Sequence, residues 1–121
     1  MDKNPTEIQE IKSILNTPLS DNPEELNNQL RYMSSWQGRL YVLETDANYD
    51  LRLAKAASLH KLIGQDIVAN DKKIMIEAET ANEERLSDLM HLWRIVLADK
   101  IMAAMSLRKG NFVEQPNTQE G

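Results

Sequence analysis

The chain has 121 residues, 27% of them charged, a formal net charge of −5 and no cysteine. This length favours a single domain, and the absence of cysteine excludes disulfides and zinc–thiolate sites and suits a reducing cytoplasm. The negative charge argues against bulk electrostatic attraction to nucleic acid, and the amino-terminal residues lack the apolar run of a signal peptide.

The first predicted element is a short helix over residues 7–16. Thr6 and Gln9 form a capping-box pattern at its start. Apolar residues then recur at helical spacing: Ile8, Ile11, Ile14 and Leu15. Pro18 ends this pattern, so residues 17–22 are predicted to be a linker.

The first long helix is predicted over residues 23–63. Asn22 suits the N-cap, Pro23 suits the first helical position, and Glu25 completes a capping box. Apolar residues follow at helical spacing, and no further proline interrupts the segment. Gly64 is placed where a left-handed residue commonly ends a helix.

A turn over residues 64–70 is predicted to lead into a second long helix over residues 71–109. Asn70 or Asp71 can cap its start, and Gly110 lies just past its predicted end. Two long helices joined by a short turn form an antiparallel, coiled-coil-like hairpin.

The predicted fold class is therefore all-α, with the long hairpin preceded by the short helix. We expect one helical domain over residues 1–110 and no strand. Residues 111–121 are polar and contain a proline, and we expect them to form a flexible tail.

The apolar surface of the second long helix is too wide for one partner helix. Ten apolar residues between Leu86 and Leu107 cover about half of a helical wheel, and Ile95, Met102 and Met105 lie outside even that arc. A single partner helix buries a narrower stripe. We therefore expect the chain to form a homo-oligomer, and the short helix to pack on its own hairpin or on a neighbouring subunit.

Catalysis is not expected. Asp88 and His91 resemble half of a carboxylate–histidine metal motif, but no second copy follows, so we expect no metal and no other cofactor. The chain lacks phosphate-binding, dinucleotide-binding, zinc-protease and nucleophile-elbow motifs. The segment Leu86–Leu107 also carries five charged or ionisable residues, so no membrane span is predicted.

One central block of the chain is basic. Residues 51–76 have a net charge of +3, whereas residues 1–50 and 77–99 have net charges of −5 and −4. The basic residues flank the predicted turn from both sides: Arg52, Lys55, Lys61, Lys72 and Lys73. They form either an ordinary solvated surface or, where several hairpin tips gather in an oligomer, a basic rim that contacts phosphates.

Three segments resemble bacteriophage recombination mediators of the UvsY kind. They are LRYMSSWQGRL (30–40), LRLAKAASLHK (51–61) and HLWRIVLADKIMAAMSLRKG (91–110). The three segments together make up about a third of the chain. It implies an oligomeric helical protein that binds single-stranded DNA and helps load a recombinase. It also implies a DNA-binding role for Arg52 and Lys55, and an assembly role for five residues of the last helix: Leu89, Trp93, Val96, Leu97 and Ile101.

The resemblance therefore favours a cytoplasmic mediator that binds single-stranded DNA through the basic block, with a recombinase as partner. The alternative is a viral adaptor or inhibitor that docks a protein through acidic helix faces without binding nucleic acid. Its candidate residues are Glu77, Glu79, Glu83 and Glu84.

Overall fold

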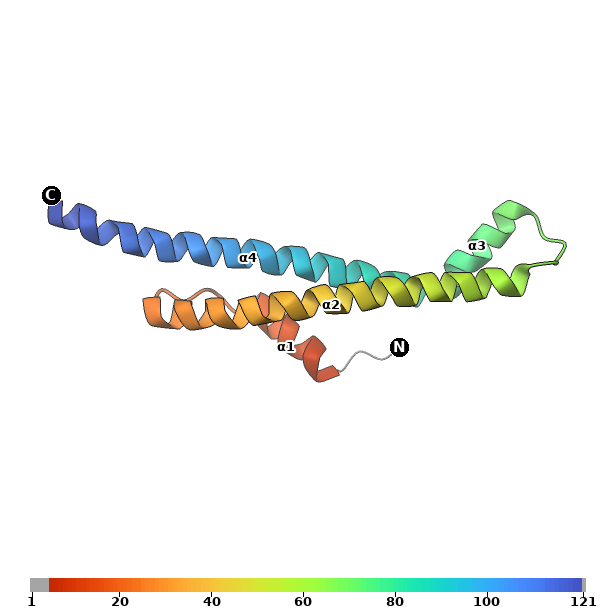
Figure 1. Cartoon of the computed structure of the whole chain (residues 1–121), viewed down its shortest axis with the longest axis horizontal. Helices are drawn as coiled ribbons and strands as arrows, with labels where there is room; N and C mark the ends of the chain where they lie inside the picture. Colours follow the sequence, from red (N-terminus) through yellow and green to blue (C-terminus); the bar gives the residue numbers. More distant parts are fainter. Residues whose placement is uncertain (1–4, 121) are drawn as a thin grey trace. The chain divides into compact units, whose positions relative to one another are not determined.

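The structure is a computed structural model that describes the backbone of residues 5–120 and the side chains of residues 6–110. Helices connected by short loops make up this part of the chain, which contains no strand, so the predicted all-α class is confirmed (Figure 1). The four helices are α1 (Pro5–Asn16), α2 (Pro23–Leu62), α3 (Ala69–Glu79) and α4 (Ala81–Glu120).

The predicted limits of α2 agree with the structure because local signals set them. The side-chain oxygen of Asn22 accepts hydrogen bonds from the backbone N–H groups of Glu24 at 2.9 Å and Glu25 at 3.2 Å. Two otherwise unpaired donors at the helix start are satisfied in this way. At the other end, Gly64 has a φ of 83°, the left-handed conformation that favours glycine after a helix.

The second long helix is not continuous as predicted, because it is divided at Thr80 into α3 and α4. Thr80 is buried, and its hydroxyl donates a hydrogen bond of 2.8 Å to the backbone oxygen of Ile76. A threonine that bonds back to the preceding turn bends a helix, which accounts for the break. The predicted end of this helix at Lys109 is not its end in the structure, because α4 continues past Gly110. One glycine inside a helix costs only about 1 kcal/mol relative to alanine.

The described chain divides into two compact units. Unit 1 is formed by residues 41–92, which include the carboxyl-terminal part of α2, all of α3 and the beginning of α4. Among the described residues, unit 2 is formed by residues 5–40 and 93–120, which include α1, the amino-terminal part of α2 and the remainder of α4.

Unit 1 is an antiparallel pairing with a mixed polar and apolar interior. Figure 1 shows α3 beside the carboxyl end of α2. Ser58 donates a hydrogen bond of 2.5 Å to Glu79 across this contact. Leu43, Ala47, Leu62 and Met90 supply the buried apolar side chains. Four polar residues are buried with them: Glu44, Ser58, Thr80 and Ser87.

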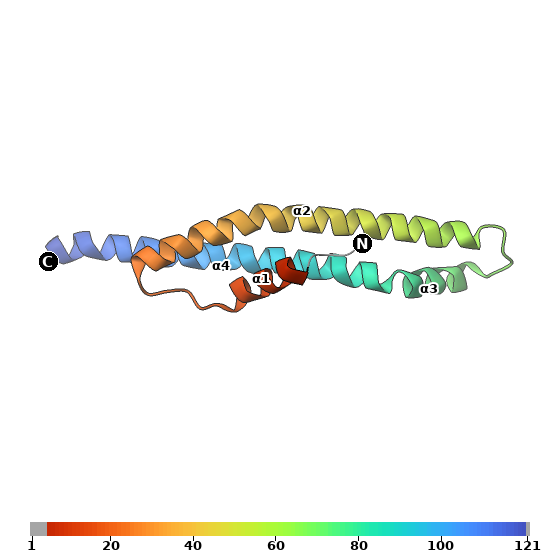
Figure 2. The same cartoon turned by 90° about the horizontal axis from the view of Figure 1, so that it is seen from below.

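Unit 2 has the larger apolar core. Eleven buried side chains from its three helical segments form this core: Ile11, Ile14, Leu26, Leu30, Met33, Trp36, Leu40, Trp93, Leu97, Ile101 and Ala104. In Figure 2 α1 overlaps α4, and Lys100 on α4 donates a hydrogen bond of 2.7 Å to the backbone oxygen of Ile14 on α1. The guanidinium of Arg39 on α2 also binds the carboxylate of Glu7 on α1, at 2.6 and 2.9 Å. The short helix was expected to pack on its own hairpin or on a neighbouring subunit, and in this structure it packs on helices of its own chain.

Candidate functional site

The five basic residues predicted to bind nucleic acid all lie in unit 1. Arg52, Lys55 and Lys61 are exposed on α2. On α3, Lys73 is exposed and Lys72 is half-buried. All five can therefore reach solvent, at least in part, but acidic residues accompany several of them.

Two lysines of the basic block are paired with glutamates. The Lys55 ammonium lies 3.3 Å from the carboxylate of Glu84, and that of Lys61 lies 4.0 Å from the carboxylate of Glu79. Residues 41–92 carry six basic and ten acidic side chains, so unit 1 has a net charge of −4. On net charge alone, this unit therefore repels a polyanion, so binding would need local contacts.

An exposed face of α2 in unit 1 combines tyrosine with arginine. Tyr41 is 63% exposed, Tyr49 is 55% exposed, and Arg52 is also exposed. At about 100° per residue, the three side chains lie within an arc of roughly 80°. We call this set the Tyr–Arg face.

The acidic residues of α2 within unit 1 lie outside the Tyr–Arg face. They are Glu44, Asp46 and Asp50. Sequence analysis identified Arg52 but missed Tyr41 and Tyr49, although their spacing of eight residues places them on neighbouring parts of one helix surface. Exposed aromatic rings beside an arginine are suited to stacking against bases while the guanidinium contacts a phosphate.

Three of the five residues predicted to form a subunit interface belong to the core of unit 2 instead. Trp93, Leu97 and Ile101 are buried there, because α4 turns this stripe towards the other helical segments of the same unit. They are therefore not available as exposed contact area. Leu89 is half-buried in unit 1, and Val96 is exposed in unit 2.

The exposed apolar surface of α4 in unit 2 lies on other faces of the helix. Ile95, Met102 and Met105 are exposed. Together with the half-buried Ala98, they follow one another along α4 at intervals of three, four and three residues. This spacing is typical of a seam between two paired helices. We call these four residues the α4 seam, and it contains the three apolar residues that lie outside the predicted arc.

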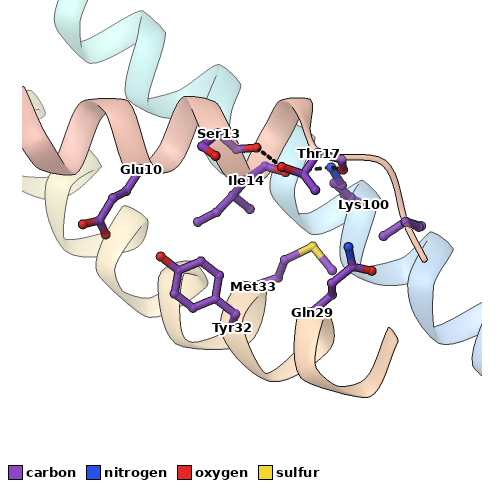
Figure 3. Close-up of a pocket in the computed structure, with 9 residues that line it drawn as sticks. Glu10, Ser13, Ile14, Thr17, Gln29, Tyr32, Met33 and Lys100 are labelled. Carbon is purple, nitrogen blue, oxygen red and sulfur yellow. Dashed lines mark hydrogen bonds between the residues drawn. The ribbon is translucent and has the colours of Figure 1, made fainter. Parts of the chain in front are cut away.

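Lys100 holds the end of α1 within unit 2. Its ammonium donates hydrogen bonds to the backbone oxygens of Ile14 at 2.7 Å, Leu15 at 3.3 Å and Thr17. Figure 3 shows this contact at the side of a hollow into which the ring of Tyr32 points. The three donors of the amine thus meet the carbonyl groups that a helix end leaves unpaired. Burial at this position lowers the pKa of Lys100.

The predicted half-motif for a metal has a different role in the structure. Nδ1 of His91 lies 2.5 Å from a carboxylate oxygen of Glu44, inside unit 1. Among the described residues, no group of three histidine or acidic side chains is arranged to hold a metal ion. None of the described helices is long and apolar enough to cross a membrane.

Comparisons of the chain with protein-family models, with curated proteins and with solved structures gave no match.

Proposed function

We propose that this chain is a self-assembling helical protein without catalytic activity that binds single-stranded nucleic acid and acts as a recombination mediator. The resemblance of three segments to UvsY-like mediators supports this proposal. The observation that carries it is the Tyr–Arg face of unit 1, where Tyr41, Tyr49 and Arg52 are exposed together.

Stacking contributes more than charge to the proposed binding. Stacking of a base on an aromatic side chain contributes about 1 to 3 kcal/mol and tolerates any sequence, because every base has a π-face. Phosphate contacts are left mainly to Arg52 and Lys73, since Lys55 and Lys61 already lie near glutamates. Binding of this kind is tolerant of sequence and has a modest dependence on salt.

Self-assembly is proposed to use the α4 seam. A helix that is apolar on nearly all sides is normally buried, and α4 in unit 2 has buried apolar residues on one face and exposed ones on others. Pairing of seams between copies would cover Ile95, Ala98 and Met102, the first three residues of the seam. Such an oligomer would also present several Tyr–Arg faces to one strand, which raises the apparent affinity without any new contact.

The direct test is fluorescence anisotropy of a labelled oligo(dT) strand titrated with the full chain at several salt concentrations. We expect Y41A/Y49A to weaken binding by about tenfold or more, because two stacking platforms are lost. Tyr32→Ala is the matched control, since Tyr32 is exposed to a similar degree in unit 2. Absence of binding by the unaltered chain even at low salt would exclude the mediator function.

A second candidate is the adaptor that acts through acidic faces. The net charge of −4 in unit 1, and the glutamates beside Lys55 and Lys61, favour it. In that case E77Q/E83Q would weaken retention of the protein partner, and Y41A/Y49A would not. Glu77 and Glu83 are suited to this test because neither forms an ion pair within residues 6–110, whereas Glu79 and Glu84 do.

A further inference from the structure

A second set of cationic side chains lies in unit 2, outside the basic block. Arg31 on α2 and Arg108 on α4 line one open hollow with a volume of about 610 Å³. Asn27 and Ser34 line the same hollow, one helical turn on either side of Arg31. Its remaining lining residues are apolar: Leu30 and Met105.

Among the side chains of residues 6–110, no carboxylate neutralises the charge of this hollow. No acidic residue lines it, and within residues 6–110 neither Arg31 nor Arg108 forms an ion pair. Glu24 lies two turns from Arg31 on the same side of α2 but does not line the hollow. This contrasts with Lys55 and Lys61 in unit 1, which both lie near glutamates.

The polar groups of the hollow are suited to an oxyanion. Each guanidinium offers a planar fork of N–H donors that can bind a phosphate through two parallel hydrogen bonds. Ser34 adds a hydroxyl donor and Asn27 an amide donor. The arginines come from two different helices, so one phosphate can be held from two sides.

The size and the apolar part of the hollow indicate a ligand larger than a free phosphate ion. Pockets for small organic ligands are typically about 300 to 1,000 Å³, and this one falls inside that range. The side chains of Leu30 and Met105 give it an apolar surface, and the thioether of methionine packs well against aromatic rings. A nucleotide combines a phosphate with an aromatic base. Each nucleotide of a single strand carries both groups.

We propose that this hollow is a second nucleotide-binding site, in which Arg31 and Arg108 hold a backbone phosphate of a single strand and Met105 contacts the adjoining base or sugar. The proposal deepens the proposed function and rests on it for the strand as the source of the nucleotide. The second site differs from the Tyr–Arg face in its residues and in the unit to which they belong. A strand held only by the Tyr–Arg face would not depend on these arginines.

The test compares three double variants of the full chain in oligo(dT) anisotropy. R31Q/R108Q removes both guanidinium groups, and R31K/R108K keeps the charge but loses the planar fork. K12Q/K109Q is the matched control, because it removes two exposed positive charges of unit 2 that do not line the hollow. Thermal unfolding by circular dichroism is measured for each variant, so that a loss of folded structure is recognised.

We expect R31Q/R108Q to weaken binding by about tenfold or more, since hydrogen bonds between a guanidinium and a phosphate are among the strongest in proteins. The salt dependence should become shallower by about 1.4 in slope for two lost phosphate contacts. R31K/R108K should fall between R31Q/R108Q and the unaltered chain, and K12Q/K109Q should change the affinity by less than about threefold. Equal affinities for R31Q/R108Q and K12Q/K109Q would overturn the site.

A second measurement separates this inference from the proposed function. Thymidine 5′-monophosphate is titrated into ¹⁵N-labelled chain, and the backbone signals of residues 27–34 and 105–108 are followed by NMR. Shifts that are confined to these residues and absent in R31Q/R108Q support the nucleotide site, whether or not an oligonucleotide binds. If the shifts are seen and no oligonucleotide binds, the nucleotide site is supported and the mediator function is excluded. Oligonucleotide binding that depends on Tyr41 and Tyr49 but not on Arg31 and Arg108 keeps the mediator function and overturns the second site. Absence of both signals overturns both.

Discussion

Glu44 on α2 and His91 on α4 meet inside unit 1, with 2.5 Å between a carboxylate oxygen and Nδ1. One turn further along α2, Asn48 accepts a hydrogen bond from Ser87, which lies one turn back along α4. Four residues forward on one helix therefore correspond to four residues back on the other. Each pair has one buried member, Glu44 or Ser87, and the constant offset of the two pairs favours one antiparallel register.

We expect Glu44 and His91 to be coupled energetically. In a double-mutant cycle with Glu44→Gln and His91→Gln, the interaction energy should be about 1 kcal/mol, because the histidine side chain is partly exposed and solvent screens the contact. Urea unfolding of the four proteins measures it. A coupling energy indistinguishable from zero would mean that the pair does not contribute to the register.

Helix α3 should exchange its amide hydrogens faster than the other helices of unit 1. None of its residues is buried, and its side chains contact α2 through Glu79, which binds Ser58 and lies near Lys61. Elements with little buried apolar area open locally at low free energy. Hydrogen exchange followed by mass spectrometry should show low protection over residues 70–79 and high protection over residues 84–92. Equal protection in the two segments would contradict this expectation.

The same substitution at two positions of α4 should have very different effects. Leu97 is almost completely buried, and Leu97→Ala should lower the free energy of unfolding by about 2 to 5 kcal/mol. Leu107 is about half exposed, and Leu107→Ala should lower it by less than about 1 kcal/mol. Chemical denaturation at a protein concentration below that of self-assembly checks both values. Similar losses would show that burial in unit 2 is assigned wrongly.

Self-assembly should respond to the α4 seam and not to the core stripe. Changing Ile95 and Met102 to Gln should dissociate the oligomer into folded subunits, because both side chains are exposed within the chain. Changing Leu97 and Ile101 to Glu should instead unfold unit 2, since buried unpaired charge is strongly destabilising. Light scattering and circular dichroism distinguish the two results. An unaltered chain that is monomeric at micromolar concentration would contradict the assembly proposal.

Lys100 should make stability depend on pH in alkaline solution. Burial lowers the pKa of Lys100 below its ordinary value of 10.5, so the folded chain releases this proton at a lower pH than the unfolded chain. Between these two pKa values the unfolded state binds more protons, and the free energy of unfolding rises with pH. Lys100→Met removes this contribution. The stability of the unaltered chain relative to Lys100→Met should therefore increase as the pH rises towards 10.5, as measured by urea unfolding.

Local signals made part of this fold predictable from sequence. The start of α2 depends on Asn22 and Pro23 and its end on Gly64, and each acts within a few residues of its own position. The break at Thr80 was missed because threonine is tolerated inside helices. It bends the chain here through a back-bonded hydroxyl in a buried setting, which sequence spacing does not reveal.

The candidate sites were less predictable because they depend on which helix faces meet. Both the stripe with Leu97 and the seam with Met102 have spacings suited to helix pairing, and only the packing of unit 2 decides which one is buried. Arg31 and Arg108 are separated by most of the chain, and the antiparallel pairing of α2 and α4 brings them to one hollow. The residues on either side of each arginine do not indicate that the two side chains lie close together.

Gly38 lies inside α2 with open space around it, since an added Cβ atom would meet no other atom within 4 Å. The chain contains no cysteine. Gly38→Cys would therefore introduce a single thiol at an exposed position where no packed neighbour has to move. One dye can be attached there selectively, and energy transfer between dyes on separate copies would report subunit exchange in the proposed oligomer in real time.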